Sequence, residues 1–262
     1  MTGPAFFRLG PDGLFTGNDA ARGPWSPDHC HAGPVAGLAA RAAEAAIGPD
    51  KMLTRLTLDI LRPLPLAGLR VEAEVTRHSR TLGTTRIAVR DTDGTLCMAG
   101  SSMHLVRKDM GALPTAPAEP PVFPGPGSGP FPLEVRRHGL RSFGDCMDVA
   151  WPPGQRPGPG PKTVWMRAPA LLEGEAQTPV QTLCALADSG NGISWNAPLT
   201  EIGFMNTDLT LQVHREPRGD WLASQALSHW QGNGIGMSQA VLHDRNGPVA
   251  VALQTLVLHP VG

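Results

Sequence analysis

The sequence predicts an α+β protein made of two similar units, each with one helix followed by antiparallel strands. In the first half, a helical run of small residues, "GPVAGLAARAAEAAIG" (33–48), precedes strand-like sequence, and "TPVQTLCALADSGNG" (178–192) does so in the second half. Landmarks then recur at a nearly constant offset, since Arg62 and Arg215 lie 153 positions apart and further His and Gly pairs lie 151 or 153 apart. A nearly constant offset is typical of a duplicated unit.

The strands are predicted from alternation of hydrophobic and polar side chains. Hydrophobic residues occupy every second position over 55–60 and again over 71–75, which is the pattern of a strand with one buried face. The sequences "DTDG" and "DRNG" lie between strand-like runs and favour hairpin turns. A further short strand is expected before each helix, at 12–17 and 162–167. Since one helix can cover little else, we expect each sheet to curl around its helix.

Glycine and proline divide the chain. The 31 glycines and 27 prolines crowd into 113–132 and 151–162, where missing N–H donors and fixed φ angles exclude continuous helix or sheet. We therefore predict an N-terminal unit over 1–110, a Pro/Gly-rich connector over 111–162 and a C-terminal unit over 163–262.

Composition excludes several classes of protein. A chain of 262 residues with 41% hydrophobic content can bury a sizeable core. A net charge of −1 offers no basic surface for nucleic acid, and no apolar stretch approaches the roughly 18 residues of a spanning helix. The four cysteines show no CxxC spacing and form no disulfide framework. We expect a cytoplasmic protein that binds no nucleic acid and has no membrane span.

Asp188 ends an apolar helical run and is followed at once by Ser-Gly-Asn-Gly. Leu183 and Leu186 mark the apolar side of this helix, and Cys184 shares the face of Asp188, so the carboxylate should border the core. Burial of this kind raises the pKa of a carboxyl group. The alternative is a helix-end carboxylate released to solvent. The first helix has no acid over 40–43, before Glu44, so the repeated fold does not itself demand one.

Gln254 lies within "VAVALQTLVL", a run that is apolar on both faces and therefore predicts a central strand. A buried amide needs hydrogen-bond partners, which are either neighbouring backbone groups or the components of a site. The offset of 153 places Ser101 at the equivalent position of the first unit.

Five short motifs, taken in order, resemble one known family. These are "HAGPVAGLAARAAE", "VWMR", "LADSGNG", "NTDLTLQVHR" and "ALQTL". Together they span nearly the whole chain and are similar to the double hot-dog acyl-CoA thioesterases of the thioesterase II type. The resemblance implies an α+β tandem double hot-dog fold, in which each unit is a long helix wrapped by a curled antiparallel sheet. It also implies hydrolysis of a fatty acyl-CoA, or a related thioester, to the free acid and CoA.

The resemblance further implies a site in which an Asp, a Gln and a Thr or Ser surround one water molecule. Asp188 and Gln254 match the first two positions. The hydroxyl position falls on Asn206, a departure from the family pattern, with Thr207 directly after it and Thr210 further along. An amide can orient water but cannot act as a nucleophile, so either Asn206 replaces the hydroxyl or one of the threonines supplies it. The carboxylate would then act as general base on the water.

Substrate contacts are expected at the remaining motifs. His31 and Gly33 open the first helix, and Thr210 lies on the strand that carries the hydroxyl position. His214 and Arg215 could meet the phosphates of CoA, although a solvated hairpin end would need no function.

No metal or other cofactor is expected. "DHCH" (28–31) has metal-binding residue types, but no second ligand cluster is visible in the sequence. We expect one active site per chain, built mainly from the second unit with walls from the first helix. Unpaired sheet edges would allow a homodimer.

Two alternative functions remain open. One is a non-catalytic acyl-CoA-binding homologue, because the hydroxyl position is altered. The other is a hot-dog enoyl-CoA hydratase, which needs D-x-N-P-x-H spacing, whereas Asp28 lies only three residues before His31 and no such proline is present. An α/β-hydrolase is disfavoured because the chain has no G-x-S-x-G motif.

Overall fold

The computed structural model describes residues 5–116, 118–133 and 139–261, so residue 117 and residues 134–138 of the predicted connector lie outside the described residues. The first half comprises β1 (Phe7–Leu9), β2 (Phe15–Gly17), α1 (Ala32–Ile47), β3 (Lys51–Ile60), β4 (Arg70–His78), β5 (Leu82–Arg90) and β6 (Leu96–Val106). The connector contributes the 3₁₀ helix η1 (Phe143–Cys146) and β7 (Asp148–Ala150). The second half comprises β8 (Lys162–Arg167), α2 (Pro179–Ala187), α3 (Gly190–Ile193), β9 (Ile202–Asn206), β10 (Asp208–Val213), β11 (Leu222–Trp230), β12 (Ile235–Asp244) and β13 (Gly247–Pro260).

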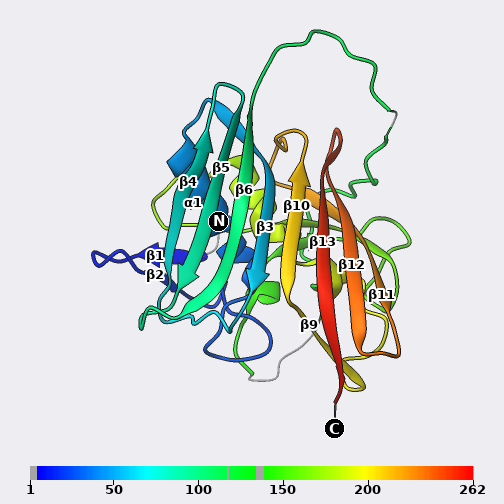
Figure 1. Ribbon diagram of the computed structural model, residues 1–262. Helices are drawn as coiled ribbons and strands as arrows, with labels where there is room; N and C mark the ends of the chain where they lie inside the picture. Colours follow the sequence, from blue (N-terminus) through cyan, green and yellow to red (C-terminus); the bar gives the residue numbers. More distant parts are fainter. Residues whose placement is uncertain (1–4, 117, 134–138, 262) are drawn as a thin grey trace.

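One large antiparallel sheet contains strands from both halves of the chain. Its order is β4-β5-β6-β3-β10-β13-β12-β11-β8-β7, and β9 pairs with the end of β13. The halves meet where β3 pairs with β10, with Thr57 opposite Thr210. Figure 1 shows the strands side by side in front and the helices behind them. The predicted combination of helices with a large antiparallel sheet is therefore confirmed, while the domain boundaries stay a prediction.

The core lies between the sheet and the helices. Alternate side chains of the two joining strands are buried there: Leu56 and Leu58 of β3, and Leu209 and Leu211 of β10. This is the period-two burial that the sequence predicts. No helix among the described residues is long and apolar enough to cross a membrane.

Glycines allow α1 and α2 to pack closely. A Cβ atom at Gly33 would collide with the carbonyl oxygen of Ala185, and one at Gly37 would lie 3.3 Å from the carbonyl oxygen of Gln181. The N-terminus of α1 therefore lies against the C-terminus of α2. This contact brings His31, the N-cap residue of α1, next to Asp188, the C-cap residue of α2.

The second predicted helix is not continuous over 178–192. Helix α2 ends at Ala187, and the single turn of α3 begins at Gly190. Glycine, serine and asparagine are weak helix formers, so the sequence after Asp188 breaks the helix instead of extending it. The break places Asp188 at a helix end inside the core, where it is 3% exposed.

The register of β6 corrects the predicted counterpart of Gln254. Gln254 faces the core opposite Ser238, whereas in the first half Ser102 faces the core opposite Thr85. Ser101, the predicted counterpart, lies on the other face of its strand, because neighbouring residues of a strand point in opposite directions. The structural offset is thus 152 at this position, one residue less than expected.

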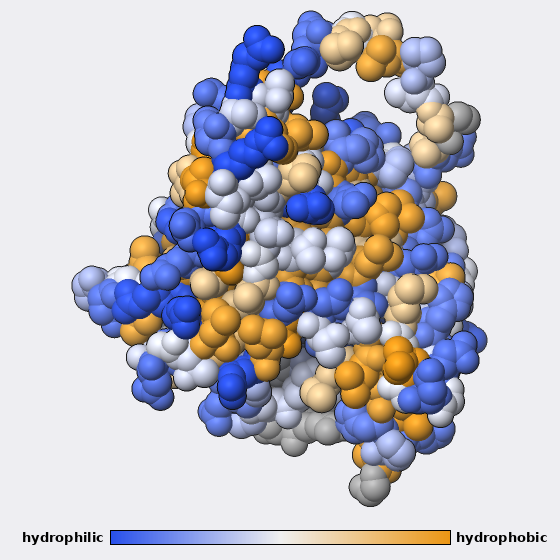
Figure 2. All heavy atoms as spheres, in the orientation of Figure 1, coloured by the Kyte–Doolittle hydropathy of each residue, from blue (hydrophilic) through white to orange (hydrophobic). Residues whose placement is uncertain are grey.

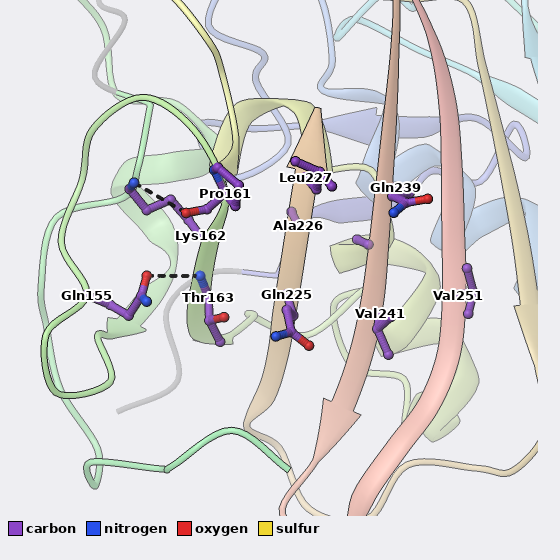
Figure 3. A pocket seen from close by; sticks show the side chains of 11 residues that line it. Gln155, Pro161, Lys162, Thr163, Gln225, Ala226, Leu227, Gln239, Val241 and Val251 are labelled. Carbon is purple, nitrogen blue, oxygen red and sulfur yellow. Dashed lines mark hydrogen bonds between the residues drawn. The ribbon is translucent and has the colours of Figure 1, made fainter. Parts of the chain in front are cut away.

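The outer face of the sheet carries both hydrophobic and polar side chains. Five hydrophobic side chains are exposed on β12 and β13: Ile235, Met237, Val251, Leu253 and Val257. Figure 2 shows hydrophobic patches between polar ones on this side of the molecule. A shallow hollow of about 500 Å³ lies on the same face over β11 and β12 (Figure 3). Lys162 is its one charged lining residue among the described residues, and its ammonium group donates to the carbonyl oxygens of Pro159 and Pro161. None of the predicted site residues lines this hollow.

Candidate active site

Asp188 lies in the wall of a cavity of about 380 Å³ that both halves of the chain enclose. The lining comes from the loop before α1, the end of β3 and the loop after it, the connector, the break between α2 and α3, strand β9 with Thr207 after it, and strand β13. Four aromatic side chains contribute to the walls: Trp25, Phe131, Phe143 and Phe204. A mostly apolar cavity with a few polar groups is typical of small-molecule sites.

The two oxygens of Asp188 have different surroundings. Oδ1 accepts hydrogen bonds from Asn206 Nδ2 at 2.5 Å and from Gln254 Nε2 at 2.8 Å. Oδ2 lies 3.3 Å from Nδ1 of His31. The sequence predicts one site for Asp188, Gln254, Asn206 and His31, and the structure brings these side chains together.

The amide of Gln254 is fixed at both ends. Besides Oδ1 of Asp188, Nε2 donates to the backbone carbonyl oxygen of Asp188 at 3.1 Å, and Oε1 accepts from the backbone N–H of Asn191 at 3.2 Å. Gln254 thus ties the central strand β13 to the turn after α2. Its contacts hold the carboxylate in one orientation.

Burial raises the pKa of Asp188 to about 7. Hydrogen bonds from Asn206, from Gln254 and from the backbone N–H of Gly33 act in the opposite direction, because they stabilise the charged form. A carboxyl group with a pKa near neutrality can both accept and release a proton at physiological pH, which is what general acid–base chemistry requires.

His31 is neutral at physiological pH. Burial lowers the pKa of His31 to about 4, and Nδ1 accepts the backbone N–H of Gly33 at 3.1 Å as the N-cap of α1. An Nδ1 that accepts carries no proton, so the contact with Asp188 is not an ion pair at neutral pH.

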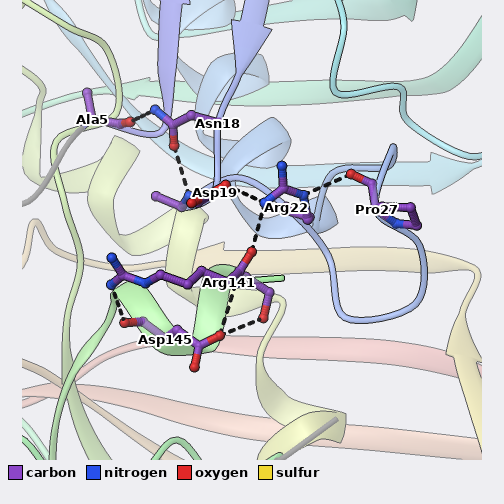
Figure 4. A network of polar contacts seen from close by, with 9 residues as sticks. Ala5, Asn18, Asp19, Arg22, Pro27, Arg141 and Asp145 are labelled. Carbon is purple, nitrogen blue, oxygen red and sulfur yellow. Dashed lines mark hydrogen bonds and ion pairs between the residues drawn. The ribbon is translucent and has the colours of Figure 1, made fainter. Parts of the chain in front are cut away.

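The connector supplies part of the cavity wall. The ring of Phe143 in η1 stacks on His31, with ring centroids 4.1 Å apart and planes 8° apart. Its backbone N–H donates to the carbonyl oxygen of Arg22 at 2.8 Å. Figure 4 shows how the guanidinium of Arg22 also bonds Asp19 and the carbonyl oxygens of Pro27 and Arg141. This network fixes η1 against the loop before α1.

Thr207, Thr210 and His214 do not contribute a free hydroxyl or ring to Asp188. Thr207 lines the cavity, but it is exposed and its hydroxyl donates to the carbonyl oxygen of Thr255 at 3.4 Å. Thr210 lies on the outer face of the sheet, and His214 is exposed at the far end of β10.

Arg215 also lies outside the cavity and serves the fold. Its guanidinium bonds both oxygens of Asp244 at 2.6 and 2.7 Å, and Asp244 is fully buried. The expected contacts of Thr210, His214 and Arg215 with substrate are therefore not carried into the proposed site.

Arg215→Ala is expected to lower the free energy of unfolding by about 3 kcal/mol, because it leaves the buried carboxylate of Asp244 without its cation. Denaturant unfolding measures this effect. Arg218→Ala is the matched control, since the exposed Arg218 bonds Asp244 through its backbone N–H alone, and it should change stability by less than about 0.5 kcal/mol. Equal effects of the two variants would contradict this role of Arg215.

Glu44 of α1 makes a contact that is the reciprocal of the one made by Asp188. Asp188 faces the N-cap residue of α1, and Glu44 faces Thr178, the N-cap residue of α2, whose hydroxyl donates to it at 2.9 Å. Gln181 Nε2 donates to the same carboxylate at 2.7 Å, and burial raises the pKa of Glu44. The first helix thus carries a partly buried carboxylate directly after the acid-free segment 40–43, although Glu44 is not among the residues that line the cavity.

Ser189 lines the cavity directly after Asp188 and is not among the site residues that the sequence predicts. The signal was available, because a serine between a candidate base and a glycine break must lie close to that base. Among the described residues, no group of three or more His, Cys, Asp or Glu side chains is arranged to hold a metal ion.

The large antiparallel sheet and the buried carboxylate in a mostly apolar cavity define a protein with a candidate small-molecule site. Residues 21–104 match the N-terminal domain of acyl-CoA thioesterases and residues 114–258 match the C-terminal domain, so the chain belongs to the acyl-CoA thioesterase family.

Solved structures share the fold at low sequence identity. An acyl-CoA thioesterase II, TesB2, from Mycobacterium marinum is 18% identical with a TM-score of 0.67, covering 97% of this chain and 94% of that one. A tesB protein of Mycobacterium avium subs paratuberculosis is 15% identical, TM-score 0.66, covering 94% and 93%. A hot-dog protein of unknown function from Alicyclobacillus acidocaldarius is 16% identical, TM-score 0.71, covering 94% and 93%. No curated protein matches the chain by sequence. At these identities the likeness establishes the hot-dog fold alone.

Proposed function

We propose that this member of the acyl-CoA thioesterase family hydrolyses an acyl-CoA thioester to the free acid and CoA, using a water molecule activated by Asp188. We also propose that its hot-dog fold is duplicated in tandem, with α1 and α2 as the two central helices. The reciprocal contacts of Asp188 with the N-cap of α1 and of Glu44 with the N-cap of α2 support this duplication.

The proposed reaction proceeds in two steps. The water oxygen bonds to the thioester carbonyl carbon while one water proton passes to Oδ2 of Asp188. The tetrahedral intermediate then collapses, the C–S bond breaks, and the CoA thiolate takes the proton from Asp188. Gln254 and Asn206 act as positioning residues, because both donate to Oδ1 and leave Oδ2 for the water.

The observation that carries the proposal is the environment of Asp188. A carboxyl group that is buried in an aromatic-walled cavity, with a pKa of about 7 and one oxygen held by two amides, has the features of a general base.

A hydrolysis assay tests this function. The purified protein is incubated with acyl-CoAs of graded chain length, and release of the CoA thiol is followed with a thiol reagent. Hydration of an enoyl-CoA is followed in parallel. Thiol release that depends on Asp188 supports the proposal, whereas hydration without thiol release would replace it with the hydratase function.

A second candidate function is acyl-CoA binding without catalysis. The observation in its favour is that neither Asn206 nor the neighbouring threonines present a free hydroxyl to Asp188. Calorimetric binding of an acyl-CoA by a protein that releases no thiol from it would support this candidate.

The kcat/KM for hydrolysis is expected to rise about tenfold per pH unit below pH 7 and to level off above it. The base must be ionised to take a proton from water, and burial holds the pKa of Asp188 at about 7, so its active form disappears as pH falls. Steady-state kinetics between pH 5 and 8.5 measure this profile. A flat profile down to about pH 5 would show that Asp188 does not act as the base.

A further inference from the structure

The hydroxyl of Ser189 is buried and has no partner. The residue is 1% exposed, and its Oγ forms no hydrogen bond with any described residue. Ser189 is the N-cap residue of α3, yet its side chain makes no capping bond to that helix. A buried hydroxyl without a partner costs free energy, so its retention calls for an explanation.

Its position supplies the explanation. Ser189 directly follows Asp188 and lines the same cavity. The polar side chains that contact the carboxylate are already bonded: Asn206 and Gln254 donate to Oδ1, and Nδ1 of His31 accepts from the backbone N–H of Gly33. The hydroxyl of Thr207 is directed to a backbone carbonyl oxygen instead.

We propose that Ser189 is a catalytic residue whose hydroxyl accepts the second hydrogen of the attacking water. It would thereby supply the hydroxyl that Asn206 lacks, from the turn after α2 instead of from strand β9. This inference rests on the proposed hydrolytic function.

The hydroxyl contributes orientation and takes no proton in the reaction. One water hydrogen passes to Oδ2 of Asp188 as the new C–O bond forms, and the other stays on the oxygen, hydrogen-bonded to Ser189 Oγ. With both hydrogens directed, a lone pair of the water points to the carbonyl carbon. The proton on Asp188 then leaves with the CoA thiolate, so the hydroxyl ends unchanged.

Ser189→Ala tests this role through two opposed readouts. The kcat for acyl-CoA hydrolysis is expected to fall at least tenfold, while KM changes by less than about twofold, because the lost contact is to water. The melting temperature is expected to stay the same or to rise, since no bond within the protein is lost. Ser189→Thr, which keeps a hydroxyl, is expected to restore most of kcat.

Ser224→Ala is the matched control. Ser224 is also 1% exposed with an unpartnered hydroxyl, but it lies on β11 and does not line the cavity. It should match Ser189→Ala in thermal stability and keep full kcat. The inference is overturned if Ser189→Ala keeps the wild-type kcat, or if folded Ser189→Thr is as slow as the alanine variant. A wild-type protein that releases no CoA overturns the proposed function itself, and the role of Ser189 with it.

Discussion

Asp188→Asn is expected to lower kcat/KM for thioester hydrolysis about 10²- to 10⁴-fold, the contribution typical of a general base. The substitution keeps the shape of the side chain, and its Oδ1 can still accept from Asn206 and Gln254. An amide has no basic oxygen at neutral pH, so the water loses its proton acceptor. Steady-state kinetics on the folded variant measure the loss.

Glu44→Gln is the matched control for this substitution. Glu44 is also a partly buried carboxylate at the end of a central helix, with its pKa raised by burial, yet it lies outside the cavity. Hydrolysis by this variant should remain within about twofold of the wild type. Near wild-type turnover by Asp188→Asn would instead make Asp188 a structural residue.

Asp188→Asn should also be more stable than the wild type at alkaline pH. The folded protein binds the Asp188 proton more tightly than the unfolded chain does, so between pH 4 and 7 this group lowers the free energy of unfolding as pH rises, by up to about 1.4 kcal/mol per unit. His31 has a lowered pKa and acts in the opposite direction between about pH 4 and 6.5. The difference between variant and wild type therefore isolates the Asp188 effect.

The sequence predicted the arrangement of the fold better than its local detail. Period-two patterning located β3, and the glycine at position 48, with a φ of 88°, ended the first helix where a helix end was expected. The register could not be predicted to one residue, because a bulge or a turn of different length changes the offset without changing the pattern. For this reason a constant offset predicts Ser101 at the position where the structure has Ser102.

The site residues that could be predicted from the sequence are polar residues within otherwise apolar elements. A carboxylate on an apolar helix and an amide on an apolar strand are locally anomalous, so Asp188 and Gln254 could be selected from the sequence. The stacking of Phe143 on His31 could not, because it joins residues 112 positions apart through a connector without periodic pattern. The structural role of Arg215 could not be predicted either. Its charged partner, Asp244, is buried, and the two residues meet only in the tertiary structure.

Gln254→Ala is expected to lower turnover at least tenfold at pH 7, and part of the loss should return at higher pH. Gln254 donates to Oδ1 of Asp188 and so lowers a pKa that burial raises. Removing this donor should raise the pKa of Asp188 above 7, so that less of the base is ionised at neutral pH. The inflection of the kcat/KM profile should therefore move to a higher pH than in the wild type.

Stability separates this role from a purely structural one. The substitution also leaves the backbone N–H of Asn191 unpaired, at a cost of about 1–3 kcal/mol, so kinetics must be measured at temperatures where circular dichroism shows a fully folded variant. Gln239→Ala is the matched control, because Gln239 is exposed on the outer face of β12, and it should leave both the pH profile and the melting temperature unchanged. A large fall in melting temperature with an unchanged kinetic pKa and unchanged turnover per folded molecule would remove Gln254 from the catalytic arrangement, because a residue that merely pairs buried backbone groups cannot move the titration of the base.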